Sequence, residues 1–162
     1  TQGYSSAASD VYKRQIQIRV KGGAYGCMCS FSDQGDSMFV TYRDPNLSES
    51  YKVYDEAADY VVDFDADDRD MKKYIIGTIG SMDMPMEAVD MGARSFHAYF
   101  LGKTEADLQK VRDQVLSCTQ EDIRALAPIV KAVVEAGNRC CIGNEEKIDQ
   151  NKEYFDEVKH VL

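Results

Sequence analysis

The sequence has no long apolar run. Charged residues recur throughout its 162 positions, whereas a membrane-spanning helix needs about 18 to 20 consecutive apolar residues. It also lacks a cationic start followed by an apolar stretch of about 7 to 15 residues, the pattern of a secretory signal peptide. We therefore predict a protein without a membrane partner. If the natural N-terminus is present, the same absences favour a cytoplasmic location.

Basic residues are also in short supply. Lys and Arg number 19 against 28 Asp and Glu, which gives a formal net charge of −9 at pH 7. Binding to phosphates requires a concentrated basic face, so we expect no nucleic acid partner. A surplus of acidic residues is an ordinary means of keeping a protein soluble, and it would also suit neutral or basic peptides as partners.

Histidine is nearly absent. The sequence contains only His97 and His160, and neither belongs to a His-x-x-Glu-His arrangement. His97 is flanked by aromatic residues, which favours a packed helix position. The acidic run over residues 63–70 lacks the glycine and the terminal glutamate of a calcium loop. We therefore predict no metal site and no cofactor in this chain.

The five cysteines form no recognisable disulfide framework, because their number is odd and the chain does not resemble a small disulfide scaffold. Neighbouring cysteines of a strand point to opposite faces, and Cys27-x-Cys29 has no matching second pair. Buried small residues are therefore favoured over metal ligands. We predict free thiols in a reducing compartment.

The N-terminal part divides at residue 16. Residues 1–15 are rich in Ser, Ala and Gln without periodicity, and we expect a disordered or foreign leader. From Ile16 to Lys21 apolar and polar residues alternate, which predicts a half-buried strand ending at the two glycines that follow. Further strands are expected over 24–31, 37–43 and 139–143, with a hairpin turn over 32–36.

Capping residues and apolar stripes predict helices over most of the remaining chain. Thr104-x-x-Asp107 and Thr119-x-x-Asp122 resemble capping boxes. The other helices are expected after Asn46, after Asp65, around residues 94–101 and over 148–162. Residues 16–162 thus predict one α+β domain, with a small antiparallel or mixed sheet of three or four strands packed against five or six helices. Such a sheet leaves an exposed edge, so we expect a part of the domain upstream.

Segment 19–26 (RVKGGAYG) is the most unusual local feature. Gly22 and Gly23 permit positive φ and close approach of another backbone. Taken alone, the segment is typical of a tight turn with an incidental Arg19 and Tyr25. It is not a dinucleotide-binding fingerprint, because the glycine spacing and the following helix are missing.

Segment 19–26 resembles the Arg-x-x-Gly-Gly-Ala-Tyr-Gly segment in the C-terminal half of presequence-protease-like members of the pitrilysin/insulinase family of zinc metallopeptidases. The resemblance covers about residues 18–162. Four further segments resemble the same region in the same order: FVTYRDPNL (39–47), YDEAADY (54–60), YIIGT (74–78) and IGNEEK (142–147).

The resemblance implies the C-terminal, substrate-clamping part of a zinc metalloendopeptidase that degrades short unfolded peptides. Members of the family bind zinc through an inverted His-x-x-Glu-His motif and a distal Glu in an N-terminal domain. This chain would therefore be inactive alone, with a peptide and the N-terminal catalytic half as its partners. Arg19 and Tyr25, with Gly22, Gly23 and Ala24, would bind the substrate or the transition state.

A shared site for Arg19 and Tyr25 requires a bend. On one straight strand the two residues would lie roughly 20 Å apart, which is too far for one scissile bond. Either the glycines turn the chain, or the two side chains contact different parts of an extended peptide.

The segment before Arg19 departs from the family, which has Leu and Trp there, so we expect a truncated gene product that lacks upstream elements of its domain. Two alternatives to the peptidase interpretation remain open. The chain is alternatively a non-catalytic scaffold or binding subunit of the same fold. If the resemblance is accidental, it is an unrelated α+β interaction domain.

Overall fold

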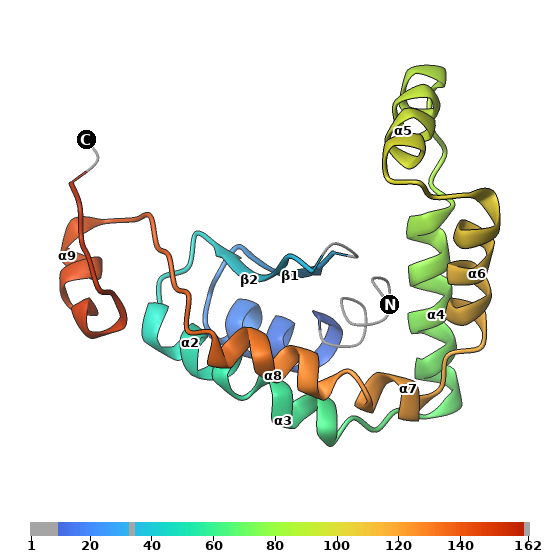
Figure 1. Ribbon diagram of the computed structural model, residues 1–162. Coiled ribbons are helices and arrows are strands. Elements are labelled where there is room, and N and C mark those ends of the chain that lie inside the picture. The colour runs from blue at the N-terminus through green and yellow to red at the C-terminus, as the bar shows by residue number, and fades with distance from the viewer. Residues whose placement is uncertain (1–9, 33–34, 161–162) are drawn as a thin grey trace.

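A computed structural model describes residues 10–32 and 35–160, with side chains from residue 16 onward. In that part the chain forms one two-stranded sheet, eight α-helices and two helices of other types. Figure 1 shows the sheet over a layer of helices, with α4, α5 and α6 rising at one end and α9 at the other. The α+β prediction is confirmed. The sheet is smaller than the predicted three or four strands, and the helices outnumber the predicted five or six.

The segment predicted as the first strand is helical. A π-type helix, η1, spans Asp10–Lys21, so the strand prediction for residues 16–21 is wrong. Of the three alternating apolar residues only Ile18 is buried, at 2% exposure, whereas Val20 is 73% exposed. The intervening Gln, Arg and Lys residues are good helix formers. Residues 10–15 of the predicted leader belong to η1, and residues 1–9 lie outside the described part.

Two strands form within the predicted strand segments 24–31 and 37–43. β1 spans Gly26–Phe31 and β2 spans Ser37–Tyr42. They pair antiparallel from Gly26↔Tyr42 to Phe31↔Ser37. The predicted turn between them includes residues 33–34, which lie outside the described part.

The core lies between the sheet and the helices beneath it (Figure 1). These helices are α2 (Leu47–Asp55), α3 (Ala57–Val62), α7 (Gln120–Arg124) and α8 (Ala127–Glu135). Phe31 from β1 joins Phe64, Ile123 and Val130 in one buried cluster. Packing of the sheet on this layer gives the hairpin one covered face and one open face.

Three helices extend from this layer as an arm. They are α4 (Asp68–Met82), α5 (Ala88–Phe100) and α6 (Glu105–Leu116). Phe64 contacts Tyr74 of α4, which ties the arm to the core. α5 lies above α4 and α6 in Figure 1 and contains no buried residue. It is longer than the helix predicted around residues 94–101.

The capping signals are largely confirmed. Thr104 and Thr119 each form a complete capping box with the aspartate three residues later. Helix α4 begins later than predicted, because Asp67 rather than Asp65 accepts a hydrogen bond from the Asp70 amide. α2 begins directly after Asn46 as expected, although the Asn46 side chain does not cap it.

The C-terminal segment departs from its prediction. Residues 139–143 form no strand, because no described strand edge pairs with them. The predicted helix over 148–162 is replaced by α9 (Glu145–Asp149) and a 3-10 turn, η2 (Lys152–Tyr154). Asn144 starts α9 early by accepting a hydrogen bond from the Lys147 amide.

Candidate functional site

Segment 19–26 is the connection between η1 and β1. The Ala24 amide donates to the Ile18 carbonyl at 3.1 Å, which closes the end of the helix. Ile18 and Ala24 are buried at 2% and 4% exposure, and both pack with Cys27 and Tyr54. The connection is therefore anchored in the core at its two ends.

The two glycines are required by the geometry of this connection. A Cβ added at Gly22 would lie 2.5 Å from the Ile18 carbonyl oxygen, a backbone atom that cannot move aside. Gly23 has φ +75°, the left-handed conformation that commonly ends helices. Asn46 donates from Nδ2 to the Gly22 carbonyl at 2.6 Å, which joins the turn to the start of α2.

Arg19 and Tyr25 both lie on the surface of this turn. Arg19 is exposed on η1, and Tyr25 is 67% exposed. The Gly23 amide lies 3.1 Å from the Arg19 carbonyl oxygen, so the Cα atoms of Arg19 and Tyr25 lie within about 14 Å of each other. The bend that a shared site requires is present. A peptide of about four extended residues spans that distance.

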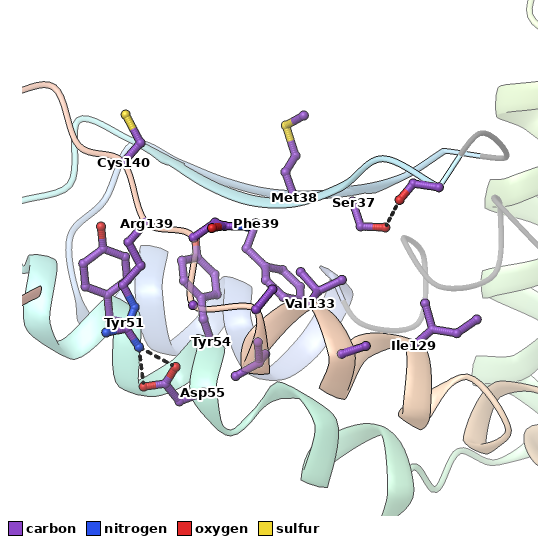
Figure 2. Close-up of a pocket in the computed structure, with 16 residues that line it drawn as sticks. Ser37, Met38, Phe39, Tyr51, Tyr54, Asp55, Ile129, Val133, Arg139 and Cys140 are labelled. Carbon is purple, nitrogen blue, oxygen red and sulfur yellow. Dashed lines mark hydrogen bonds and ion pairs between the residues drawn. The ribbon is translucent and has the colours of Figure 1, made fainter. Parts of the chain in front are cut away.

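The face of the hairpin that points away from the helices carries exposed apolar side chains. Met28 of β1 is exposed, whereas Cys27 and Cys29 on either side of it are buried. Figure 2 shows Met38 and Phe39 on opposite sides of β2, and Phe39 stacks on Tyr54 with ring centroids 5.2 Å apart. We define the open face as Tyr25, Met28, Met38, Tyr42 and Arg43. Methionine-rich surfaces adapt readily to varied ligands.

Tyr25, Tyr42 and Arg43 form one cluster at the end of the open face. The Tyr25 amide donates to the Tyr42 carbonyl at 3.1 Å, and the two rings meet edge to face with centroids 6.0 Å apart. The Arg43 guanidinium lies 6.0 Å from the Tyr25 ring centroid and 5.4 Å from that of Tyr42. The sequence-based site missed Tyr42 and Arg43. Tyr42 lies opposite Gly26 in the hairpin register, and Arg43 follows Tyr42 directly in the sequence; this proximity to segment 19–26 is the signal that could have found them.

A groove of about 450 Å³ lies on the other side of β2, between the strand, α2 and α8 (Figure 2). Arg139 crosses one end of it and pairs with Asp55. Burial, followed by the nearby Cys141 thiol, raises the pKa of the Tyr51 phenol to about 12. Tyr51 therefore stays protonated, as an uncharged wall of this groove.

The described residues do not fit a zinc site. Within residues 16–32 and 35–160, whose side chains are described, no three His, Cys, Asp or Glu side chains come together as metal ligands. His160 contacts only Glu145 among charged partners in that part, at 3.6 Å. None of the described helices is both long and apolar enough to span a bilayer.

The five cysteines form no disulfide among the described residues, and they differ in exposure. Cys27, Cys29 and Cys118 are buried, in agreement with the sequence-based prediction, whereas Cys140 is exposed. Burial raises the pKa of Cys118 to about 11. The buried cysteines act as small apolar residues beneath the sheet.

Known proteins contain a region similar to this chain. The family model of the PreP C-terminal domain matches residues 8–144. The protein HypA of Clostridium perfringens is 41% identical over 145 residues, which are 90% of this chain and 15% of that protein. Presequence protease 1, chloroplastic/mitochondrial, of Arabidopsis thaliana is 33% identical over 90% of this chain and 14% of its own length. The mitochondrial presequence protease of Aspergillus fumigatus is 35% identical over 81% of this chain and 12% of its own length.

Proposed function

Because the chain belongs to the family of PreP C-terminal domains, the C-terminal domain of presequence-protease-like peptidases, we propose that it clamps the substrate of a zinc metalloendopeptidase. The proposed substrate is a short unfolded peptide. The chain spans about one seventh of the length of the curated relatives named above. The N-terminal catalytic half is therefore proposed as its partner and as the source of the zinc ligands.

The observation that supports the proposal most directly is an exposed phenol on a turn that is anchored in the hydrophobic core. Tyr25 follows the buried Ala24 directly, so its position is set by core packing while its side chain is largely exposed. Arg19 is exposed on η1, shortly before the same turn. Phenol and guanidinium groups are hydrogen-bond donors that suit a substrate carbonyl or the oxyanion of a tetrahedral intermediate. Neither group can activate water by itself.

The open face supports the binding of an extended peptide beside this turn. Met28 and Met38 offer apolar contacts that tolerate varied side chains, and no described strand pairs with the outer edge of β2. An extended peptide can contact both a turn and the neighbouring sheet surface. A cytoplasmic location is also a proposal; the names of the Arabidopsis and Aspergillus relatives place those proteins in organelles.

The test is kinetic and uses the full-length polypeptide. Arg19→Ala and Tyr25→Phe should each lower kcat/KM for an unfolded peptide by about 10²-fold or more, the usual cost of one lost transition-state donor. Zinc content should not change. Tyr99→Phe, on the exposed surface of α5, is the matched control. Wild-type rates in both site variants would refute the clamp. A wild-type protein that binds the peptide but does not cleave it would favour a scaffold subunit instead.

A further inference from the structure

We propose that Arg43 binds a carboxylate group of the peptide, either an acidic side chain or the C-terminus, and so selects among the peptides that the clamp holds. This inference rests on the proposed function, because it assumes that a peptide is bound. It assigns specificity to a side chain outside segment 19–26. Three observations on Arg43 support it: its backbone conformation, its lack of a carboxylate partner among the described residues, and its contacts with two tyrosine rings.

The backbone of Arg43 adopts an unusual conformation that its neighbours maintain. Its φ is +49°, and it is the one non-glycine residue with positive φ in the described part. Such conformations are uncommon for a residue with a long side chain, and they occur often at ligand-binding positions. The Tyr25 amide faces the carbonyls of both Tyr42 and Arg43, at 3.1 and 3.4 Å. The end of the hairpin and the glycine turn therefore both fix the backbone of Arg43.

The Arg43 guanidinium has no carboxylate partner among the described residues, in a chain that contains 28 acidic residues. The adjacent Asp44 is already engaged, because its carboxylate accepts from the Asn46 amide at 2.9 Å and from the Ser50 hydroxyl at 2.5 Å. Arg112, Arg124 and Arg139 each pair with an acidic side chain, whereas Arg19, Arg69 and Arg94 resemble Arg43 in forming no ion pair among the described residues.

The two phenol rings orient the guanidinium while leaving its hydrogen-bond donors available. Tyr25 and Tyr42 lie 6.0 and 5.4 Å from the Arg43 Cζ atom, within the range of cation–π contacts. A guanidinium that is stacked in this way keeps its planar fork of N–H donors, which matches the two oxygens of a carboxylate. Arg43 also lines a groove of about 850 Å³ beside β2, which leaves room for a ligand.

The experiment measures binding of three fluorescein-labelled decapeptides to the full-length polypeptide, kept free of zinc so that no peptide is cut, by fluorescence anisotropy. The peptides share one neutral sequence. The first has an internal Gln and an amidated C-terminus, the second has Glu in place of that Gln, and the third has a free C-terminal carboxylate. We expect the wild type to bind the second or third peptide about tenfold more tightly than the first, the usual value of a charge-assisted hydrogen bond. The peptide that binds more tightly than the first shows whether the carboxylate comes from an acidic side chain or from the C-terminus.

Arg43→Gln should abolish this preference, so that the compared peptides bind with about equal affinity. Arg43→Asn should do the same and provides a second variant, because Asn tolerates positive φ. Arg69→Gln is the matched control, since Arg69 is exposed on α4 away from the hairpin and its replacement changes the net charge equally. The control should keep the full preference.

Failure of this inference is separable from failure of the clamp. Tyr25→Phe retains the ring under Arg43, so the clamp predicts weaker binding of all three peptides with an unchanged ratio. A preference that persists in Arg43→Gln, a wild type without preference, or a wild type that binds no peptide would each overturn the role of Arg43. A preference that depends on Arg43 while Tyr25→Phe has no effect would support Arg43 and count against the clamp.

Discussion

Arg139 and Asp55 form an ion pair across 84 residues of sequence, with Nη2 of the arginine 3.1 and 3.3 Å from the two carboxylate oxygens. The same guanidinium lies 5.1 Å from the ring centroid of Tyr51 and 5.3 Å from that of Tyr154. Arg139 therefore connects α2 to the C-terminal segment through both charge and ring contacts.

Replacing Arg139 with Ala should loosen the C-terminal segment. The expected loss is about 1 to 2 kcal/mol, because one cation–π cluster and one partly exposed ion pair disappear together. Trypsin cleavage after Lys147 and Lys152, followed by mass spectrometry, should become faster. Arg69→Ala should leave both cleavage rates unchanged, and equal rates in the two variants would argue against the connection.

The Tyr51 phenol should lose its proton only at high pH. Burial raises its pKa from 10.0 to about 12, so the folded chain holds this proton at pH values where the unfolded chain has lost it. The unfolded state then binds fewer protons, and stability should fall as pH rises from about 10 to about 12. Phenolate absorbance should show a late step that Tyr51→Phe removes. The absence of that step in the wild type would contradict the assignment.

The capping box at the start of α7 should contribute measurably to stability. Thr119→Ala removes the side-chain bond to the Asp122 amide, at a cost of about 1 kcal/mol in chemical denaturation. The Thr119 hydroxyl, followed by its amide, lowers the pKa of Asp122. This contribution is therefore present at neutral pH and is lost as pH falls below the ordinary aspartate range and through the lowered pKa. In Thr119→Ala the part of this acid dependence that comes from the hydroxyl should disappear, whereas the part that comes from the amide should remain.

Gly22 and Gly92 should respond oppositely to alanine. Gly22→Ala places a methyl group against the Ile18 carbonyl, and we expect a loss of about 1 to 3 kcal/mol. A Cβ at Gly92, inside α5, meets nothing within 4 Å, so Gly92→Ala should gain about 0.5 to 1 kcal/mol from helix propensity. Denaturant unfolding measures the free energy of unfolding of both variants against the wild type. An unchanged or higher stability of Gly22→Ala would show that the turn tolerates a side chain.

The features that the sequence predicts well are those set by neighbours a few residues apart. Thr104 and Thr119 form capping boxes because the partner aspartate is three residues away. β1 and β2 lie within two predicted strand segments on either side of a predicted turn. Segment 19–26 was identified by its glycines and its resemblance, and the structure places Tyr25 at its surface.

The features that were missed depend on residues far apart in the sequence. Three alternating apolar residues in segment 16–21 fit a strand, yet only Ile18 reaches the core when the segment is helical. Residues 139–143 read as a buried strand, but Arg139 is held by Asp55 instead of by a neighbouring strand. Arg43 gives no local sign of positive φ, because that conformation arises from the pairing of Tyr25 with the end of β2.

Helix α5 has no buried side chain, so its structure is maintained mainly by its own backbone hydrogen bonds. Its amides should exchange with deuterium through local fraying, whereas those of β1 should exchange only when the core opens. The chain therefore contains regions of very different protection within one fold. A probe that averages all helices would show a broader unfolding transition than a probe placed on the sheet.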